Sequence, residues 1–132
     1  MTIKVVKKMT RPNTGVQWYN FNESNEWQRP AAFNQISKFA NASNPCEWVS
    51  TQRPDDLTII ITHKWPDLST YNSVAGDYDA SNNSAWKTYS DAQGTYNESN
   101  NITTIRYIYD SSDNLTSTQK KVRKVYWEDY SE

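Results

Sequence analysis

Apolar side chains recur with two different periods along the chain, and the two periods predict an order of strands and helices. Alternation with period two, which is typical of strands, runs over residues 3–9, 47–53, 57–65 and 102–109. Spacings of three and four, which gather apolar side chains on one side of a helix, run over residues 26–41 and, with a break at 76–83, over 66–96. The predicted order is therefore β-α-β-β-α-β.

This order predicts an α+β fold of the ferredoxin-like type, in which one antiparallel sheet carries both helices on one face. Residues 1–110 would form that domain and residues 111–132 a C-terminal extension. Within the extension, residues 119–127 alternate, which predicts a fifth strand, either at the sheet edge or exchanged with a second copy. We expect Pro66 at the first position of the second helix and Ser84 as the N-cap where that helix resumes.

The two faces of the sheet differ in what is left to cover them. The strand at 57–65 places Ile59, Ile61 and His63 on one face, which we expect the helices to cover. The other face would carry apolar side chains with no covering element, namely Val6, Trp48, Ile60 and Ile108. A large bare apolar patch is unusual on a monomer, so the pattern predicts a two-fold homodimer joined sheet to sheet through these residues.

Composition changes this picture in two respects. Hydrophobic residues make up only 36% of the 132 residues, so the core must rest largely on six Trp, nine Tyr and three Phe. The net charge of -1 excludes a globally basic nucleic-acid binder, and we expect no nucleic-acid partner. The basic cluster at 120–124 fits an edge strand protected by lysines, while contacts to phosphates are the alternative.

Counts of single residue types exclude several classes of site. Cys46 and His63 are each the only residue of their type, so neither an internal disulfide nor a Cys/His zinc site is possible. Three glycines are too few for a glycine-built nucleotide cradle, and we expect no metal and no cofactor. The longest purely apolar run is three residues, at 59–61, and no export signal is visible, which predicts a cytoplasmic protein without membrane contact.

His63 is the best candidate for chemistry, because it lies near the end of the most apolar strand. On the face that the helices would cover, Trp65 follows it, and Tyr107 and Tyr109 from the neighbouring strand would point into the same space. A histidine with aromatic neighbours could act as a general base for a small bound ligand. The alternative is a hydrogen-bonded core histidine.

Two segments carry a resemblance to known proteins. Over residues 2–110 the chain resembles dimeric α+β barrels, a group with cofactor-independent monooxygenases, muconolactone-isomerase-like proteins and stress-responsive proteins. The local match is LTIIITHKWPDLSTY at 57–71, which is similar to the group's third strand and the helix start that follows it. RPNTGVQWY at 11–19 is similar to small proteins of marine tailed phages. No catalytic motif of the group is complete here, so no catalytic residue is carried over.

Three functional hypotheses follow. The first is a non-catalytic homodimeric assembly or binding protein, for which the resemblance at 11–19 suggests a phage origin. The second is a small cofactor-independent monooxygenase or isomerase with a pocket near His63. The third is a carbohydrate-binding module, suggested by the many aromatic side chains, although their dispersal through every predicted element is typical of core packing.

Overall fold

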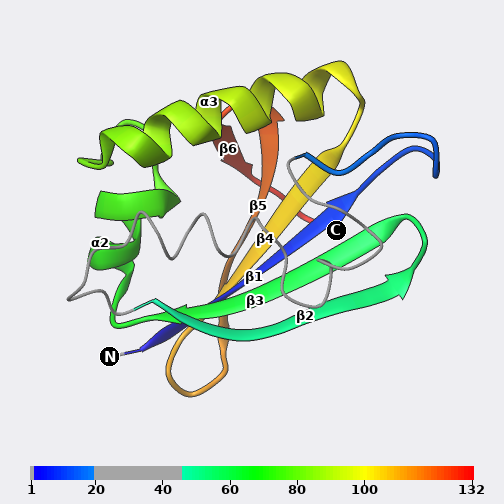
Figure 1. The fold of residues 1–132 in the computed structure, drawn as a ribbon. Helices are drawn as coiled ribbons and strands as arrows, with labels where there is room; N and C mark the ends of the chain where they lie inside the picture. Colours follow the sequence, from blue (N-terminus) through cyan, green and yellow to red (C-terminus); the bar gives the residue numbers. More distant parts are fainter. Residues whose placement is uncertain (1, 20–45) are drawn as a thin grey trace.

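The computed structural model describes residues 2–19 and 46–132, apart from the side chain of Trp48. Its strands are β1 (Ile3–Thr10), β2 (Glu47–Asp55), β3 (Thr58–Trp65), β4 (Thr103–Tyr109), β5 (Leu115–Arg123) and β6 (Tyr126–Asp129). They form one antiparallel sheet in the order β2-β3-β1-β4-β5-β6, and the long helix α3 (Ser84–Ser99) runs across it (Figure 1). The fold is α+β, as predicted, while the helix predicted at 26–41 lies outside the described residues.

Neither helix begins at the predicted position. The first position of α2 (Leu68–Tyr71) is Leu68 rather than Pro66, and the N-cap is Asp67, whose carboxylate accepts a hydrogen bond from the Thr70 backbone N–H at 2.7 Å. Asn83, not Ser84, caps α3 by accepting from the Trp86 N–H at 3.0 Å. In both cases a short side-chain oxygen satisfies a backbone donor that the first helical turn leaves unpaired. The π-helical turn η1 (Asn72–Gly76) directly follows α2.

Strand register shows which side chains face the helices. Val5 pairs with both His63 and Ile108, so these three lie on the same face of the sheet. Ile108 is only 5% exposed and packs in the core, so its predicted place on the dimer face is wrong. Tyr107 and Tyr109 consequently lie on the opposite, outer face. The alternation in β4 was predicted correctly, but the two sets of side chains were assigned to the wrong faces. A shift of one residue in register exchanges the faces of a strand.

The outer face carries Val6 and Ile60, as predicted, and both are half-buried. The backbone of Trp48 pairs with His63, and its side chain is outside the described part. Contrary to the expectation that nothing covers this face, the C-terminal residue Glu132 reaches it. The Glu132 carboxylate accepts a hydrogen bond from the Tyr107 hydroxyl at 2.8 Å.

The C-terminal extension is a hairpin rather than the single strand predicted at 119–127. Strand β5 pairs with β4, and β6 pairs with β5 and forms the edge of the sheet. Lys124 has a φ of 44°, which lies in the left-handed region and makes the tight turn between the two strands. The extension therefore continues the sheet of the domain within the same chain.

Two apolar clusters fill the space between the sheet and the helices, and aromatic rings dominate the first. It consists of Val5, Trp65, Tyr71, Ala75, Trp86 and Ile108. The second consists of Met9, Trp18, Ile59, Ile61 and Ile102. Tyr71 from α2 and Trp86 from α3 thus pack on side chains of three strands, in agreement with the prediction that aromatic residues supply much of the core.

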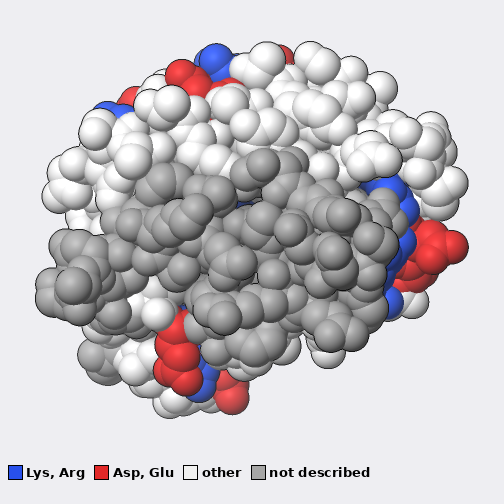
Figure 2. Space-filling view, in the orientation of Figure 1, with Lys and Arg blue, Asp and Glu red and all other residues white. Residues whose placement is uncertain are grey.

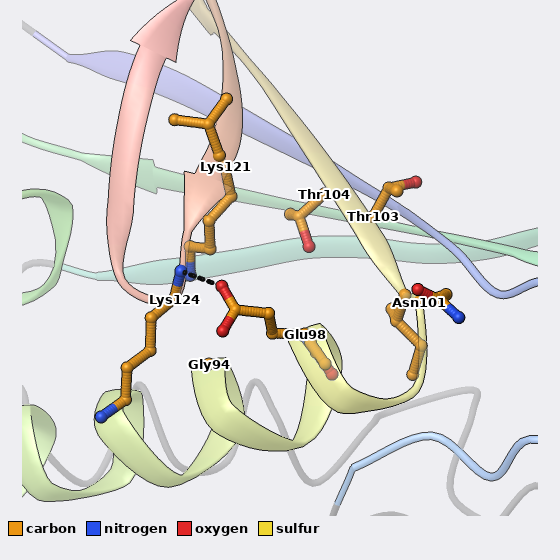
Figure 3. Close-up of a pocket in the computed structure, with 10 residues that line it drawn as sticks. Gly94, Glu98, Asn101, Thr103, Thr104, Lys121 and Lys124 are labelled. Carbon is orange, nitrogen blue, oxygen red and sulfur yellow. Dashed lines mark hydrogen bonds between the residues drawn. The ribbon is translucent and has the colours of Figure 1, made fainter.

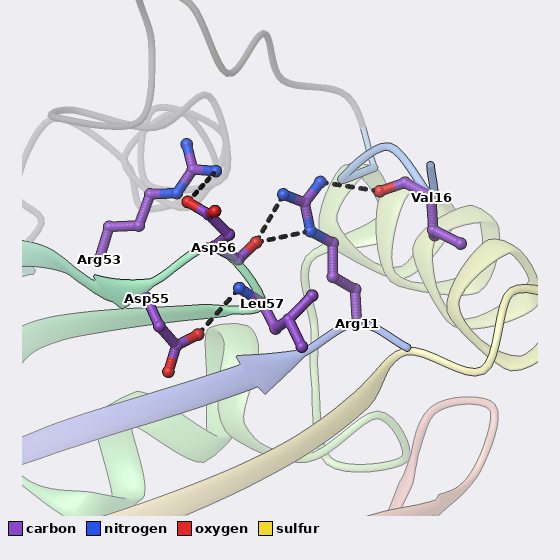
Figure 4. A network of polar contacts seen from close by, with 6 residues as sticks. All are labelled: Arg11, Val16, Arg53, Asp55, Asp56 and Leu57. Atoms are coloured by element: carbon purple, nitrogen blue, oxygen red, sulfur yellow. Dashed lines mark hydrogen bonds and ion pairs between the residues drawn. The ribbon is translucent and has the colours of Figure 1, made fainter. Parts of the chain in front are cut away.

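Arg11 joins three segments at the end of β1 (Figure 4). Its side chain is 2% exposed and donates from Nε to the Asp56 carbonyl at 2.9 Å and from Nη1 to the Val16 carbonyl at 2.9 Å. The guanidinium also lies 5.1 Å from the centre of the Trp18 ring. Arg11 thereby holds the turn between β2 and β3 against the loop that follows β1.

Gly94 is the point where α3 approaches the turn between β5 and β6. A Cβ at this position would lie 2.5 Å from the Lys124 carbonyl oxygen, a contact that requires the backbone of the turn to move. We expect Gly94→Ala to lower the free energy of unfolding by about 1–3 kcal/mol, despite the better helix propensity of alanine. Urea denaturation measures this change.

The neighbouring substitution Thr95→Ala is the matched control, because Thr95 is exposed on the same helix. It changes helix propensity without meeting the turn, and we expect it to leave stability unchanged or slightly raised. Equal stability of the Gly94→Ala and Thr95→Ala variants would contradict the close approach of α3 to Lys124.

Candidate functional site

His63 is sealed in the interior, where β3 passes beneath α2. Its side chain is 0% exposed, and its Nδ1 accepts a hydrogen bond from Trp65 Nε1 at 2.7 Å. The Tyr71 ring lies 6.0 Å away, centre to centre. His63 and Trp65 are two residues apart on one strand, so the period of two places both on the same face and lets their rings meet. The sequence predicted this pair correctly.

The hydrogen bond assigns the tautomer of His63. Because Nδ1 accepts a hydrogen bond, it carries no hydrogen, and the neutral ring must hold its hydrogen on Nε2. This Nε2–H has no hydrogen-bond partner within the structure described. Burial, followed by the positive charges of Lys7 and Arg106, lowers the pKa of His63 from 6.5 to about 3. The imidazole is therefore weakly basic and shielded from solvent, and its only acceptor nitrogen is already bonded to Trp65, which does not suit a general base.

The two tyrosines predicted beside His63 lie on the other side of the sheet. The Tyr107 hydroxyl donates to Glu132, and burial together with this bond raises its pKa to about 12. Tyr109 lies under the ammonium of Lys4, 4.8 Å from the centre of its ring. The four predicted ligand-contacting residues are therefore divided, with His63 and Trp65 inside and the tyrosines outside.

Arg106 lies two residues before Ile108 on β4 and therefore shares its interior face. It is 5% exposed and donates from Nε to Gln119 Oε1 at 2.8 Å and from Nη1 to the Gly76 carbonyl at 2.7 Å. Its guanidinium lies 4.2 Å from the centre of the Trp127 ring. These partners come from η1, β5 and β6, so only the folded sheet provides them.

Two lysines join Arg106 around the same indole ring. The Lys121 ammonium lies 4.8 Å and the Lys7 ammonium 5.8 Å from the centre of the Trp127 ring. We call Lys7, Arg106 and Lys121, with Trp127 between them, the cationic cluster. Sequence analysis missed it, although Lys7 is part of the same alternating row as Val5 and could have indicated an inward-facing charge.

The charges of the cationic cluster are not balanced by carboxylates within the described ranges. The ion pairs found there involve other lysines and Arg53, with Asp or Glu partners. Burial and the charge of Arg106 lower the pKa of Lys7 to about 8. Burial, Lys7 and Arg106 also lower the pKa of Lys121 well below its usual value. The cluster thus concentrates positive charge in the interior, and the two lysines lose their protons more easily than exposed lysines do.

Two cavities adjoin the cationic cluster. The first has a volume of about 200 Å³ and lies between α3 on one side and β4 and β5 on the other, with Lys121 and Thr104 in its lining (Figure 3). The second has a volume of about 210 Å³ and is lined in part by Arg106, Trp127 and Gly76. Both lie on the helix-covered side, away from Tyr107 and Tyr109.

Comparison with protein-family models, curated proteins and solved structures gives no match. The site must therefore be interpreted from its own geometry. In the described parts of the chain, no three His, Cys, Asp or Glu side chains gather as metal ligands would. No helix there is both long and apolar enough to cross a membrane. Burial raises the pKa of the Cys46 thiol to about 12, so this thiol stays protonated and is a poor nucleophile.

Proposed function

We propose that this protein is a non-catalytic assembly or binding protein that works as a homodimer. The observation that carries the proposal is the burial of His63, the only imidazole of the chain, with a pKa of about 3. The enzymatic alternative depended on this base, and the protonated Cys46 thiol offers no replacement. We therefore assign the protein a binding role, with the outer face of the sheet as the contact surface.

The outer face has the composition of a protein–protein contact. Val6 and Ile60 are half-buried at its centre, and two of its lysines have a carboxylate within ion-pair distance. Lys4 pairs with Asp113 at 3.1 Å, and Lys8 approaches Glu132 at 3.8 Å. Figure 2 shows positive and negative groups next to each other at the edge of the view. Such a surface supports contact with a second protein copy better than contact with a polyanionic nucleic acid.

The order of the central strands supports the finer assignment of the fold. β1 lies between β3 and β4, and β2 pairs with β3, which is the neighbour order expected of a ferredoxin-like sheet. We therefore keep the dimeric α+β barrel as the proposed arrangement, with the outer faces of two sheets in contact. The β5–β6 hairpin widens each sheet at one edge and would enlarge the contact area.

Sedimentation velocity tests the proposed dimer. We expect the wild-type protein to sediment as a dimer at tens of micromolar, with an interface above roughly 1,000 Å² in total. Ile60→Asp should give a folded monomer, because an unpaired carboxylate in an interface costs several kcal/mol. Thr88→Asp is the control, since it adds the same charge at an exposed position of α3 and should leave the dimer intact.

A wild-type monomer at these concentrations would overturn the proposed dimer. Circular dichroism establishes that each variant is folded. Should Ile60→Asp fail to fold, Val6→Lys provides the second test. Val6 lies on the adjacent strand and pairs with Thr62, which follows Ile60 by two residues and shares its outer face. A dimer that survives in the folded variant would likewise reject this face as the interface.

A further inference from the structure

We propose that the second cavity, between the loop that follows η1 and the β5–β6 hairpin, binds one neutral sugar ring. Its volume of about 210 Å³ is below the roughly 300–1,000 Å³ of pockets that take drug-sized ligands. The size therefore suits a monosaccharide rather than a longer chain. This site is separate from the outer face of the sheet, and its occupancy does not depend on the proposed dimer.

Among the described residues, three aromatic side chains from two distant segments line this cavity. Tyr78 lies in the loop after η1, while Tyr126 and Trp127 belong to β6. The ring centres of Tyr78 and Tyr126 are 6.1 Å apart, and the ring planes meet at 69°. Aromatic residues are dispersed along the sequence, but the fold gathers these three around one opening. Their apolar surfaces offer the C–H groups of a sugar ring a wall to pack on.

Arg106 and Gln119 supply unused hydrogen-bond donors on the strand side of the cavity. Arg106 Nε donates to Gln119 Oε1, and Nη1 donates to the Tyr71 hydroxyl and the Gly76 carbonyl. The two N–H groups of Nη2 therefore have no acceptor in the described chain, and Gln119 Nε2 likewise donates to no described residue. Neither nitrogen is among the sealed polar atoms of the described ranges, so both are accessible to a ligand.

Two carboxylates supply matching acceptors at the mouth of the cavity, where Asp77 and Asp79 are exposed. Asp77 Oδ1 accepts backbone N–H bonds from Asp79 at 2.9 Å and from Ala80 at 3.3 Å, which fixes this carboxylate on the loop. Asp79 Oδ1 accepts from the Tyr126 hydroxyl at 3.4 Å. Within the described residues, the second oxygen of each carboxylate stays unused. A hydroxyl both donates and accepts, so neighbouring sugar hydroxyls can join these acceptors to the guanidinium and the amide.

The charges around the cavity favour a neutral ligand. The carboxylates of Asp77 and Asp79 would repel an anion. The Arg106 guanidinium lies 4.2 Å from the centre of the Trp127 ring, and the Arg123 guanidinium lies 5.3 Å from that of Tyr126. Cations thus already lie over two of the aromatic rings and would repel an ammonium ligand. A polyhydroxyl ring uses the donors and the acceptors without adding a charge.

Titration of the isotope-labelled protein with glucose, galactose and mannose, followed by two-dimensional NMR, tests the site. We expect at least one of these sugars to shift the indole N–H signal of Trp127, with a Kd below about 50 mM. The charged counterparts of that sugar, its 2-amine and its uronate, should bind at least threefold more weakly. No shift with any of the three sugars, or equal binding of a charged counterpart, would overturn the proposal.

Two substitutions with matched controls locate the binding. Tyr126→Ala removes a wall and Asp79→Asn an acceptor charge, and each should weaken binding fivefold or more. Tyr130→Ala is the first control, because Tyr130 is 37% exposed, as Tyr126 is, but lies over Lys120 on the outer face. Asp129→Asn is the second control, since Asp129 is exposed on β6 and does not line the cavity.

Both controls should bind within twofold of wild type. Should Tyr126→Ala fail to fold, the comparison of Asp79→Asn with Asp129→Asn still decides the matter. Equal losses in a cavity variant and its control would reject this cavity as the binding site.

Discussion

Acidification from pH 6.5 to pH 5 is expected to lower the free energy of unfolding by about 2 kcal/mol through His63 alone. The folded protein binds a proton at this imidazole only near pH 3, while the unfolded chain binds one near the ordinary pKa of 6.5. Between these values the unfolded state holds more protons, so the stabilising effect of the neutral ring is complete above pH 6.5. It is lost on acidification at up to about 1.4 kcal/mol per pH unit.

Urea denaturation at a series of pH values between 7 and 5 measures this slope. His63→Gln is the informative variant, because its carboxamide oxygen can still accept the Trp65 Nε1–H bond but does not titrate. The variant should lose the part of the slope that His63 supplies. Backbone hydrogen bonds lower the pKa values of Asp67 and Asp110, so these two carboxyls titrate below this window. An equal slope in wild type and variant would show that His63 is accessible to protons in the folded state.

Ile61→Ala is expected to cost about 2–5 kcal/mol of stability, a large share of the roughly 5–15 kcal/mol typical of a small domain. Ile61 is 3% exposed and packs in the cluster with Met9, Trp18 and Ile102. Truncation removes buried methyl groups and leaves a cavity that a rigid sheet cannot close. The midpoint of urea denaturation should fall accordingly.

Leu57→Ala is the control for this prediction. Leu57 belongs to the same alternating row but is 36% exposed at the turn before β3, so its truncation should change stability little. Similar losses for both substitutions would mean that the row of Ile61 does not face the core. This comparison therefore tests the register of β3 as well as the energy of one side chain.

The candidate site shows where reasoning from the sequence succeeded and where it failed. His63 and Trp65 belong to one strand, so alternation alone was sufficient to predict that they share a face. The cationic cluster combines residues of four strands, β1, β4, β5 and β6. No local pattern links them, because their meeting depends on the pairing register between strands distant in sequence.

The parity of β4 illustrates the same limit. Alternation separated Arg106 and Ile108 from Tyr107 and Tyr109, and this separation is confirmed by the register. Which set faces inward could not be decided from hydrophobicity, since aromatic rings appeared better suited to the core than a guanidinium. Arg106 is accommodated inside by the Gly76 carbonyl, the Gln119 carboxamide and the Trp127 ring, which compensate its burial.

The sequence by itself determined the α+β class, the strands at β1, β3 and β4, and the interior row of Ile59, Ile61, His63 and Trp65. These features depend on local periodicity, which a single chain segment contains in full. The tertiary structure alone decided that Arg106 and Lys121 face Trp127 and that Glu132 covers part of the outer face. Burying a charge is favourable only when distant groups solvate it, so its position follows from the assembled sheet and not from any one strand.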